Sequence, residues 1–223
     1  MSAPEPSLAV DGRELGRRGT ETRRRLLDAT AELLEHHGVR DLRVVEITRR
    51  VGTSPATFYQ YFRDVPDAVL ALAEEVGEDL APVGELLEGA WSDDAGLDAS
   101  RALVERFITY WDEHRAVLRT RNLAAQEGDE RFRAVRIAAL RPLLEGLASR
   151  IEVSQRAGRV ARSLSAPAAA AALMAMLERM AAFHVDLEPL GASRADVVET
   201  TARIVFETVT GSRAPDGSRP HEA

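Results

Sequence analysis

Hydrophobic side chains recur along this chain every three or four residues, and no stretch alternates apolar and polar residues over the length of a strand. Such spacing places the apolar side chains on one face of an α-helix. The first stripe consists of Leu26, Thr30, Leu33 and His37, and Gly38 follows it as a stop signal. The pattern predicts an all-α protein whose first helix covers residues 20–37.

Two short helices separated by a glycine are predicted next. Apolar residues at positions 44, 47 and 51 indicate a helix over residues 44–51, which Gly52 ends. Ser54 and Pro55 then provide an N-cap and a first-turn proline for a helix over residues 56–61. This order is typical of a helix-turn-helix, although periodicity alone is equally compatible with a helical hairpin inside a bundle.

Capping and helix-breaking residues predict the remaining elements. Asp64 and Pro66 open a helix that Pro82 ends near Leu80. Residues 91–99 are expected to form a polar loop, and the Pro and Gly residues after position 210 indicate a loose tail. Longer helices are predicted over residues 100–114, 116–126, 130–156, 165–184 and 193–210, with Pro142 bending the third of them.

Composition excludes several classes of protein. The 223 residues include no cysteine, so disulfides, thiolate zinc sites and cysteine nucleophiles are absent. The longest apolar run, residues 166–177, is shorter than the roughly 18 residues that a membrane span needs. The first dozen residues lack the basic and apolar regions of a secretory signal. We therefore expect a cytoplasmic protein with no membrane partner.

Charge is unevenly distributed along the chain. The net charge of −7 argues against nonspecific coating of nucleic acid, but residues 13–25 hold six arginines against two glutamates. A local basic segment on an acidic chain is an electrostatic footprint for phosphate. A solvated polar start to the first helix would have the same composition, so charge alone leaves both interpretations open.

Enzymatic chemistry has little support in the sequence. The five histidines do not form a metal-binding spacing, and no glycine-rich phosphate loop or nucleophile-elbow motif is present. Carboxylate pairs such as Glu74-Glu75 are typical of solvated helix faces. We expect a protein that is not an enzyme and that uses no metal or cofactor.

The helix over residues 56–61 carries a polar face. Its hydroxyl and amide side chains suit phosphates and base edges, whereas Phe58 and Phe62 are the expected inward anchors. The run Arg23-Arg24-Arg25-Leu26-Leu27-Asp28-Ala29, then Gly38, then Ile47 through Ser54-Pro55-Ala56-Thr57-Phe58-Tyr59-Gln60-Tyr61-Phe62, resembles the tetracycline-repressor (TetR) family of bacterial transcriptional regulators. The chain departs from the family pattern at Val65, where the family usually has lysine, and at Thr48 and Val51, where it has alanine.

The resemblance implies a three-helix DNA-binding head followed by a helical ligand-binding and dimerisation domain. It divides the chain into a disordered arm (1–15), a helix-turn-helix domain (16–65), a ligand-binding and dimerisation domain (66–211) and a flexible tail (212–223). Carried over by position, bases would be contacted by Ala56, Thr57 and Gln60, phosphates by Tyr59 and Tyr61, the DNA backbone by Arg43, Thr53 and Ser54, and an adjacent minor groove by Arg17 and Arg18.

Two further sets of residues are assigned to the larger domain. A mixture of large apolar and a few polar side chains suits a small-molecule pocket, although ordinary core and surface positions have the same composition. The candidate pocket residues are Phe107, Tyr110, Trp111, Arg119, Asn122, Gln126, Met174, Leu177, Glu178, Met180, Phe183 and His184. The resemblance implies a dimer interface on the last two helices, with the stripes Ala170, Leu173, Leu177, Ala181 and Val198, Ala202, Val205, Val209.

The resulting hypothesis is a homodimeric repressor that a small, lipophilic effector releases from a palindromic DNA operator. One alternative is an activator or corepressor-dependent regulator of the same family. Another is a helical ligand-binding protein that no longer binds DNA.

Overall fold

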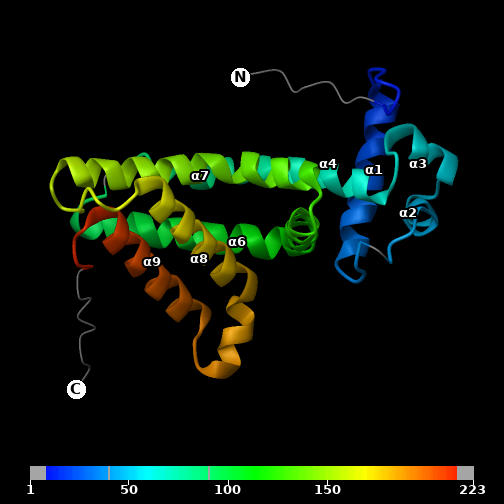
Figure 1. The fold of residues 1–223 in the computed structure, drawn as a ribbon. Helices are drawn as coiled ribbons and strands as arrows, with labels where there is room; N and C mark the ends of the chain where they lie inside the picture. The colour runs from blue at the N-terminus through cyan, green and yellow to red at the C-terminus, as the bar shows by residue number, and fades with distance from the viewer. Residues whose placement is uncertain (1–8, 40, 90, 215–223) are drawn as a thin grey trace. The chain divides into compact units, whose positions relative to one another are not determined.

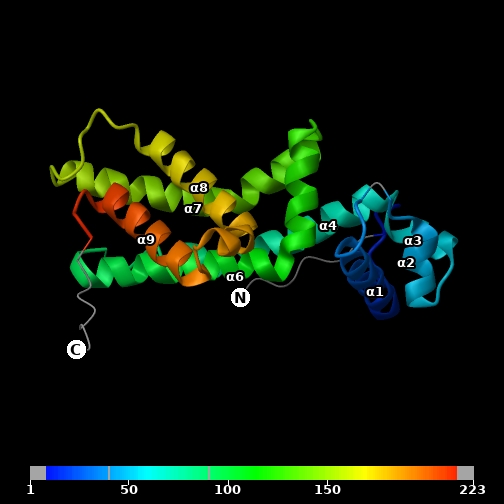
Figure 2. The same cartoon turned by 90° about the horizontal axis from the view of Figure 1, so that it is seen from below.

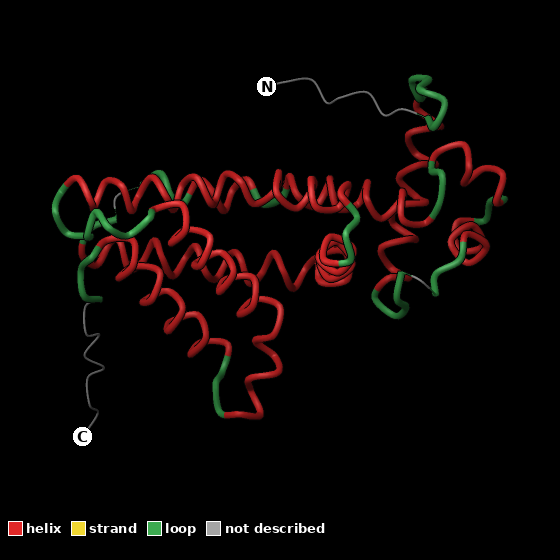
Figure 3. Tube along the Cα trace, in the orientation of Figure 1, coloured by secondary structure: helices red, strands yellow, loops and turns green. Residues whose placement is uncertain are grey.

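The structure, a computed structural model, describes residues 9–39, 41–89 and 91–214, and every regular element in these ranges is a helix (Figure 1, Figure 3). The chain divides into two compact units. The head unit comprises the described parts of residues 1–78 together with residues 114–137. The bundle unit comprises the described parts of residues 79–113 and 138–223.

Four helices from the first third of the chain build most of the head unit. They are α1 (Arg17–Leu34), α2 (Val44–Val51), α3 (Pro55–Tyr61) and α4 (Val65–Glu78). α1 packs against α2 and α4, and α3 packs on α2. α4 packs on α1, so this compact unit extends past residue 65, where the sequence predicts the domain boundary.

α1 begins and ends earlier than predicted. Its last turn tightens, since the N–H groups of Glu35 and His36 donate to carbonyls only three residues back, at 3.3 and 3.2 Å. Bonds of this type typically close the end of an α-helix. His37 therefore lies past the end of α1 and does not belong to its apolar stripe.

The basic cluster at residues 13–25 is partly used inside the head. Arg23 and Arg24 both bind the carboxylate of Glu75 on α4, at 3.3 and 2.9 Å. Arg25 donates to the Val51 carbonyl at the end of α2, at 2.6 Å. These three guanidinium groups join α1 to its neighbours, so the phosphate footprint expected from charge alone is smaller than the sequence indicates.

The bundle unit is built from the remaining helices. α5 (Ala81–Glu85), α8 (Ala166–Leu187), the 3-10 helix η1 (Glu188–Leu190) and α9 (Arg194–Thr210) belong to it entirely. It also takes parts of α6 (Asp93–Gln126) and α7 (Glu130–Arg156). α8 and α9 lie side by side (Figure 2). Within α6, His114 leaves helical geometry (φ −121°, ψ 18°), at the point where the sequence predicts two separate helices.

The start of α6 corrects the expected loop at residues 91–99. The helix begins at Asp93, and Leu97 is buried against Phe206 of α9. A Cβ atom on Gly96 would lie 2.5 Å from the backbone of Trp91. Glycine therefore allows this turn of the helix to pack closely against the Trp91 backbone. The polar residues that suggest a loop therefore cover only the outer side of a buried helix start.

The end of α9 also differs from the prediction of a flexible tail from residue 212. Gly211 has a positive φ of 71°, and a Cβ there would lie 2.4 Å from the Arg159 carbonyl, so the position requires glycine. Ala214 is buried in a cluster with Leu97 and Phe206. The chain thus stays packed through residue 214, and the rest of the predicted tail lies outside the described residues.

An ion pair between α6 and α9 gives the bundle unit a predicted acid response. Arg101 bonds to Glu199 at 2.6 Å, and this lowers the pKa of Glu199 from 4.5 to about 2. A carboxylate with a depressed pKa stabilises the fold above its unfolded-state value, and this contribution is lost as the pH falls toward the folded-state value. Between pH 5 and about pH 2, the stability advantage of the wild type over Glu199→Gln should therefore shrink.

Urea unfolding of both proteins from pH 7 to pH 3 measures this response. The side chain of Glu199 is 38% exposed, so solvent screening keeps the expected difference small. Glu188→Gln, at an exposed position of η1, serves as the matched control. A gap between wild type and Glu199→Gln that stays constant across this range would contradict the prediction.

Candidate nucleic-acid interface

A tight turn joins α2 to α3. Gly52 adopts a left-handed conformation (φ 73°, ψ 38°) that ends α2. The Ser54 hydroxyl then accepts a hydrogen bond from the Thr57 N–H at 3.2 Å, and Pro55 occupies the first turn of α3. These local signals build the helix-turn-helix that the sequence predicts.

α3 has one buried and one exposed face. Phe58 and Phe62 are 0% and 2% exposed, and their ring centroids lie 5.4 Å apart. Tyr59 is 53% exposed, and Ala56 and Gln60 also lie at the surface. The two phenylalanines hold α3 on the head while its polar face remains accessible, as the sequence predicts for this helix.

Three other predicted contact residues of this region are less accessible. Thr53, Thr57 and Tyr61 are half-buried. The hydroxyl groups of Ser54 and Thr57 lie 3.1 Å apart and are hydrogen-bonded to each other. Ser54 and Thr57 thus build the N-terminal end of α3, which is a structural role that the sequence indicates only for Ser54.

Exposed arginines surround the helix-turn-helix. Arg17 and Arg18 are exposed and lie in the first turn of α1. Arg43 lies at the surface as the N-cap residue of α2. Arg49, in the last turn of α2, is also exposed, although the contacts predicted from the sequence do not include it. Its place on the polar face of that helix is the sequence signal that identifies it.

The junction between α3 and α4 is fixed by an ion pair. Arg63 bonds to Asp67 at 2.8 Å. Partial burial acts to raise the pKa of Asp67, but hydrogen bonds from the side chain and the backbone N–H of Arg63 outweigh it and leave that pKa lowered. Val65 stands where the family that the sequence resembles usually has lysine. It is buried and begins α4. The phosphate contact expected from that lysine is therefore absent at this position.

The N-terminal segment predicted as a disordered arm is ordered in its second half. Within residues 9–15, the Val10 N–H donates to the Gln60 carbonyl on α3 at 3.0 Å. Ala9 is 8% exposed. The segment therefore lies against the end of α3, and the first eight residues of the predicted arm lie outside the described residues.

The predicted pocket residues differ in exposure and in the unit to which they belong. Arg119, Gln126 and Phe183 are exposed, which argues against their lining a closed pocket, and Asn122 and Met180 are half-buried. Arg119, Asn122 and Gln126 belong to the head unit, whereas the others belong to the bundle unit. The buried members are Phe107, Tyr110, Trp111, Met174, Leu177, Glu178 and His184.

His184 has a structural contact that sequence reasoning missed. Its Nε2 lies 2.9 Å from the carboxylate of Asp112 on α6. Arg194 of α9 binds the same carboxylate at 2.6 Å and Glu105 at 2.8 Å. One carboxylate thus joins α6, α8 and α9. Among the described residues, no three His, Asp or Glu side chains are grouped as a metal site.

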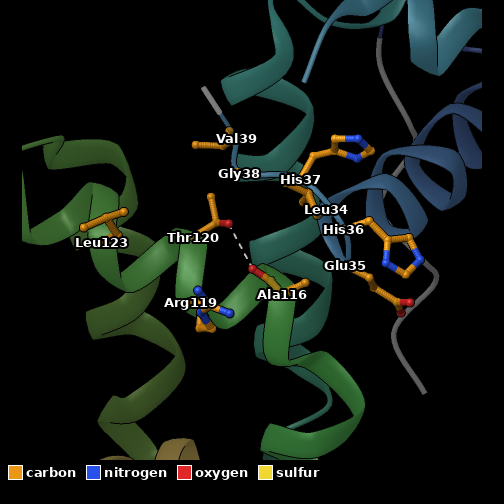
Figure 4. A pocket seen from close by; sticks show the side chains of 10 residues that line it. All are labelled: Leu34, Glu35, His36, His37, Gly38, Val39, Ala116, Arg119, Thr120 and Leu123. Carbon is orange, nitrogen blue, oxygen red and sulfur yellow. Dashed lines mark hydrogen bonds between the residues drawn. The ribbon is translucent and has the colours of Figure 1, made fainter. Parts of the chain in front are cut away.

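The clefts lined by described residues include one in each compact unit. One, of about 270 Å³, lies in the head unit between the turn after α1 and the second half of α6 (Figure 4). Arg119 and Thr120 face it, and the Thr120 hydroxyl donates to the Ala116 carbonyl at 2.9 Å. The other, of about 570 Å³, lies in the bundle unit between α5 and α7. Of the residues predicted to line a pocket, these two clefts include Arg119.

The stripes predicted for the dimer interface are mostly buried within the chain itself. Val198 is half-buried, and the other positions are at most 4% exposed. These residues pack α8 and α9 against their own bundle. The buried members are Ala170, Leu173, Leu177, Ala181, Ala202, Val205 and Val209.

The opposite side of α8 is exposed and unusually apolar. It presents the small residues Ala168, Ala171, Ala172 and Ala175, followed by Phe183. The Arg179 guanidinium lies 3.9 Å from the centre of the Phe183 ring. Within the described ranges, the segment Ala166–Leu190 is long and apolar enough to cross a membrane by length and composition alone. A helix with two apolar faces has this length and composition whether its second face contacts lipid or protein.

Comparison with known sequences assigns both parts of the chain. Residues 26–64 match the family described as "Bacterial regulatory proteins, tetR family". Residues 83–216, more than half of the chain, match "Tetracyclin repressor-like, C-terminal domain". The chain belongs to the TetR family. It is therefore a ligand-responsive, DNA-binding transcriptional regulator with a helix-turn-helix head.

Solved structures share this TetR-family fold. The regulator PfmR from Thermus thermophilus is 23% identical, with a TM-score of 0.63 over 82% of this chain and 97% of that one. FadR from Bacillus subtilis in complex with stearoyl-CoA is 15% identical, with a TM-score of 0.63 over 85% and 99%. SmeT, the repressor of a Stenotrophomonas maltophilia multidrug efflux pump, is 18% identical, with a TM-score of 0.58 over 87% and 91%. No curated protein matched the chain.

Proposed function

We propose that this TetR-family regulator is a homodimeric repressor that binds a palindromic operator in the cytoplasm through α3 and is released by a small lipophilic effector. The observation that carries the proposal is the pairing of a polar, exposed α3 face with two phenylalanines that fix the helix from behind. A short helix anchored in this way presents hydroxyl and amide groups to base edges in the major groove.

The exposed side of α8 supports dimerisation. Small side chains at Ala168, Ala172 and Ala175 let a second helix approach closely, and Ile204 is an exposed apolar side chain on α9. A two-fold axis pairs the same surface of both copies. Two α3 helices can then occupy successive major grooves, about 34–36 Å apart.

The buried residues of the bundle unit support a lipophilic effector. Phe107, Trp111 and Met174 are apolar and buried, and the polar Glu178 lies on the same helix as Met174. Pockets for small molecules are mostly apolar with few polar groups. FadR from Bacillus subtilis was solved with stearoyl-CoA, and SmeT with triclosan. An effector weakens operator binding only to the extent that it binds the DNA-incompetent conformation more tightly than the DNA-competent one.

Selection of duplexes from a random DNA library by the purified protein tests the proposal. An enriched inverted repeat is the expected result. Enrichment of a single, non-repeated site would contradict the dimeric arrangement. Absence of enrichment without a small molecule, with enrichment after adding one, would instead identify the corepressor-dependent alternative.

Two neighbouring substitutions on α3 should have different effects on the selected operator. Gln60→Ala removes a candidate base contact worth about 1–3 kcal/mol and should relax the base preference at one position of each half-site. Tyr59→Ala removes a phosphate contact and should weaken binding to all duplexes alike. Repeating the selection and titrating both duplex types measures these effects, with Gln126→Ala on the exposed end of α6 as a matched control. Unchanged operator binding by both variants would exclude α3 as the DNA-contacting helix.

A further inference from the structure

Residues 9–13 form a closed turn at the N-terminal edge of the head. The Gly12 N–H donates to the Ala9 carbonyl at 2.9 Å, and the Ala9 N–H donates to the Arg13 carbonyl at 2.9 Å. Gly12 has a positive φ of 81°. These bonds define a β-turn over residues 9–12 with Val10 at its second position. We call residues 9–13 the N-terminal clip.

The clip is bonded to the end of α3. The N–H of Val10 donates to the carbonyl of Gln60 at 3.0 Å, and Ala9 is almost fully buried. The last carbonyl groups of any helix lack partners within that helix. In α3 the Phe62 N–H satisfies the Phe58 carbonyl at 3.0 Å, and the clip satisfies the Gln60 carbonyl. The clip, which lies far from α3 in the sequence, thus supplies a hydrogen-bond donor to the last turn of α3.

The position of this bond matters because α3 is short. It has seven residues, and helices of that length are not stable without outside contacts. Tyr59, Gln60 and Tyr61 all lie in its last turn. A frayed last turn would leave the amide of Gln60 free to rotate away from a base edge, while the arginines of α1 and α2 would still attract phosphate.

We propose that the N-terminal clip is a positioning element for sequence recognition, which holds the last turn of α3 in the geometry that distinguishes one operator base from another. The proposal rests on the proposed function of α3 as the DNA-contacting helix. Val10 is a positioning residue, and it acts through its backbone N–H. Its side chain is 46% exposed and is not required for the contact.

Val10→Pro tests the clip with little disturbance. Proline is favoured at the second position of a β-turn, so the turn is retained, but proline has no N–H to donate to Gln60. Val10→Ala shortens the same side chain and keeps the N–H, which makes it the matched control. Both full-length variants are titrated with the operator obtained by selection and with an unrelated duplex of equal length, at one salt concentration.

We expect Val10→Pro to lose roughly 2- to 10-fold in operator affinity, the range of a single hydrogen bond, and to bind the unrelated duplex as the wild type does. Val10→Ala should match the wild type on both duplexes. A thermal unfolding curve of Val10→Pro close to that of the wild type separates positioning from a loss of folded head.

Other outcomes overturn the proposal. Equal operator affinity of the two variants would show that the bond to Gln60 has no part in recognition. An equal loss on both duplexes would assign the effect to general damage, and a matching loss in Val10→Ala would assign it to the side chain. If the wild type selected no duplex at all, the proposed function would fail first, and that result is distinguishable from the failure of the clip alone.

Discussion

Ala172→Glu is expected to convert the protein from a dimer to a monomer. Ala172 lies in the exposed row of small residues on α8. In the proposed dimer, close approach of a second α8 would leave no room there for a longer side chain. Across a two-fold axis the substitution places two carboxylates near each other and removes both from water. Because the proposed dimer binds the operator through two linked heads, its loss should weaken operator binding by roughly 100-fold or more.

Sedimentation velocity gives the oligomeric state, and anisotropy with the selected operator gives the affinity. Ala134→Glu, at an exposed alanine of α7, introduces the same charge on another helix surface and should leave both unchanged. A dimer that persists in Ala172→Glu would place the interface elsewhere. A monomer that keeps wild-type operator affinity would show that one head suffices for binding.

Phe58→Ala should abolish all DNA binding while leaving the dimer intact. Phe58 is fully buried in the head, with its ring 5.4 Å from that of Phe62 and 5.7 Å from that of Tyr59. Truncating a buried phenylalanine costs about 3–5 kcal/mol. That cost is a large fraction of the stability of a typical domain, about 5–15 kcal/mol. At the lower end of that range the loss removes most of the stability of the helix-turn-helix, so binding to operator and to unrelated duplexes should be lost together.

Denaturant unfolding followed by circular dichroism should show an early partial loss of helix in Phe58→Ala. Gln60→Ala, two residues away on the exposed face, is the control: it should unfold as the wild type does and retain binding to unrelated DNA. Wild-type DNA affinity in Phe58→Ala would mean that the head does not depend on this core. A loss of the dimer in the same variant would mean that the two functions share one cooperative fold.

Much of the fold is predictable because its signals are local. α2 spans the residues that its apolar spacing and Gly52 predict, and α7 begins and ends at the predicted residues 130 and 156. The interior proline of α7, Pro142, does not end the helix. Ser54 caps the helix for which it is predicted, and Ser165 and Ser193, at the first positions of two other predicted helices, are their N-caps. Capping and stop signals act within one turn of helix, so a sequence pattern captures them.

The sites were harder to predict, because they depend on which face of a helix meets which neighbour. α8 is apolar on two sides, and hydrophobic spacing does not distinguish the side that packs on its own chain from the side left for a partner. The sequence therefore places the interface on Leu173 and Leu177, which the protomer buries for itself. The contact between Val10 and Gln60 joins two backbone groups, and no side-chain pattern encodes such a bond.

The departure from helical geometry at His114 also has an evolutionary consequence. A continuous helix transmits rotation along its axis because each turn is bonded to the next, so a change at one end alters the orientation of side chains at the other. In α6 that continuity is interrupted between a half that belongs to the bundle unit and a half that belongs to the head unit. Substitutions, and even insertions, that adapt the first half to a new chemical signal need not rotate the second. The break therefore lets side chains on the bundle half of α6 change orientation without turning those on the head half.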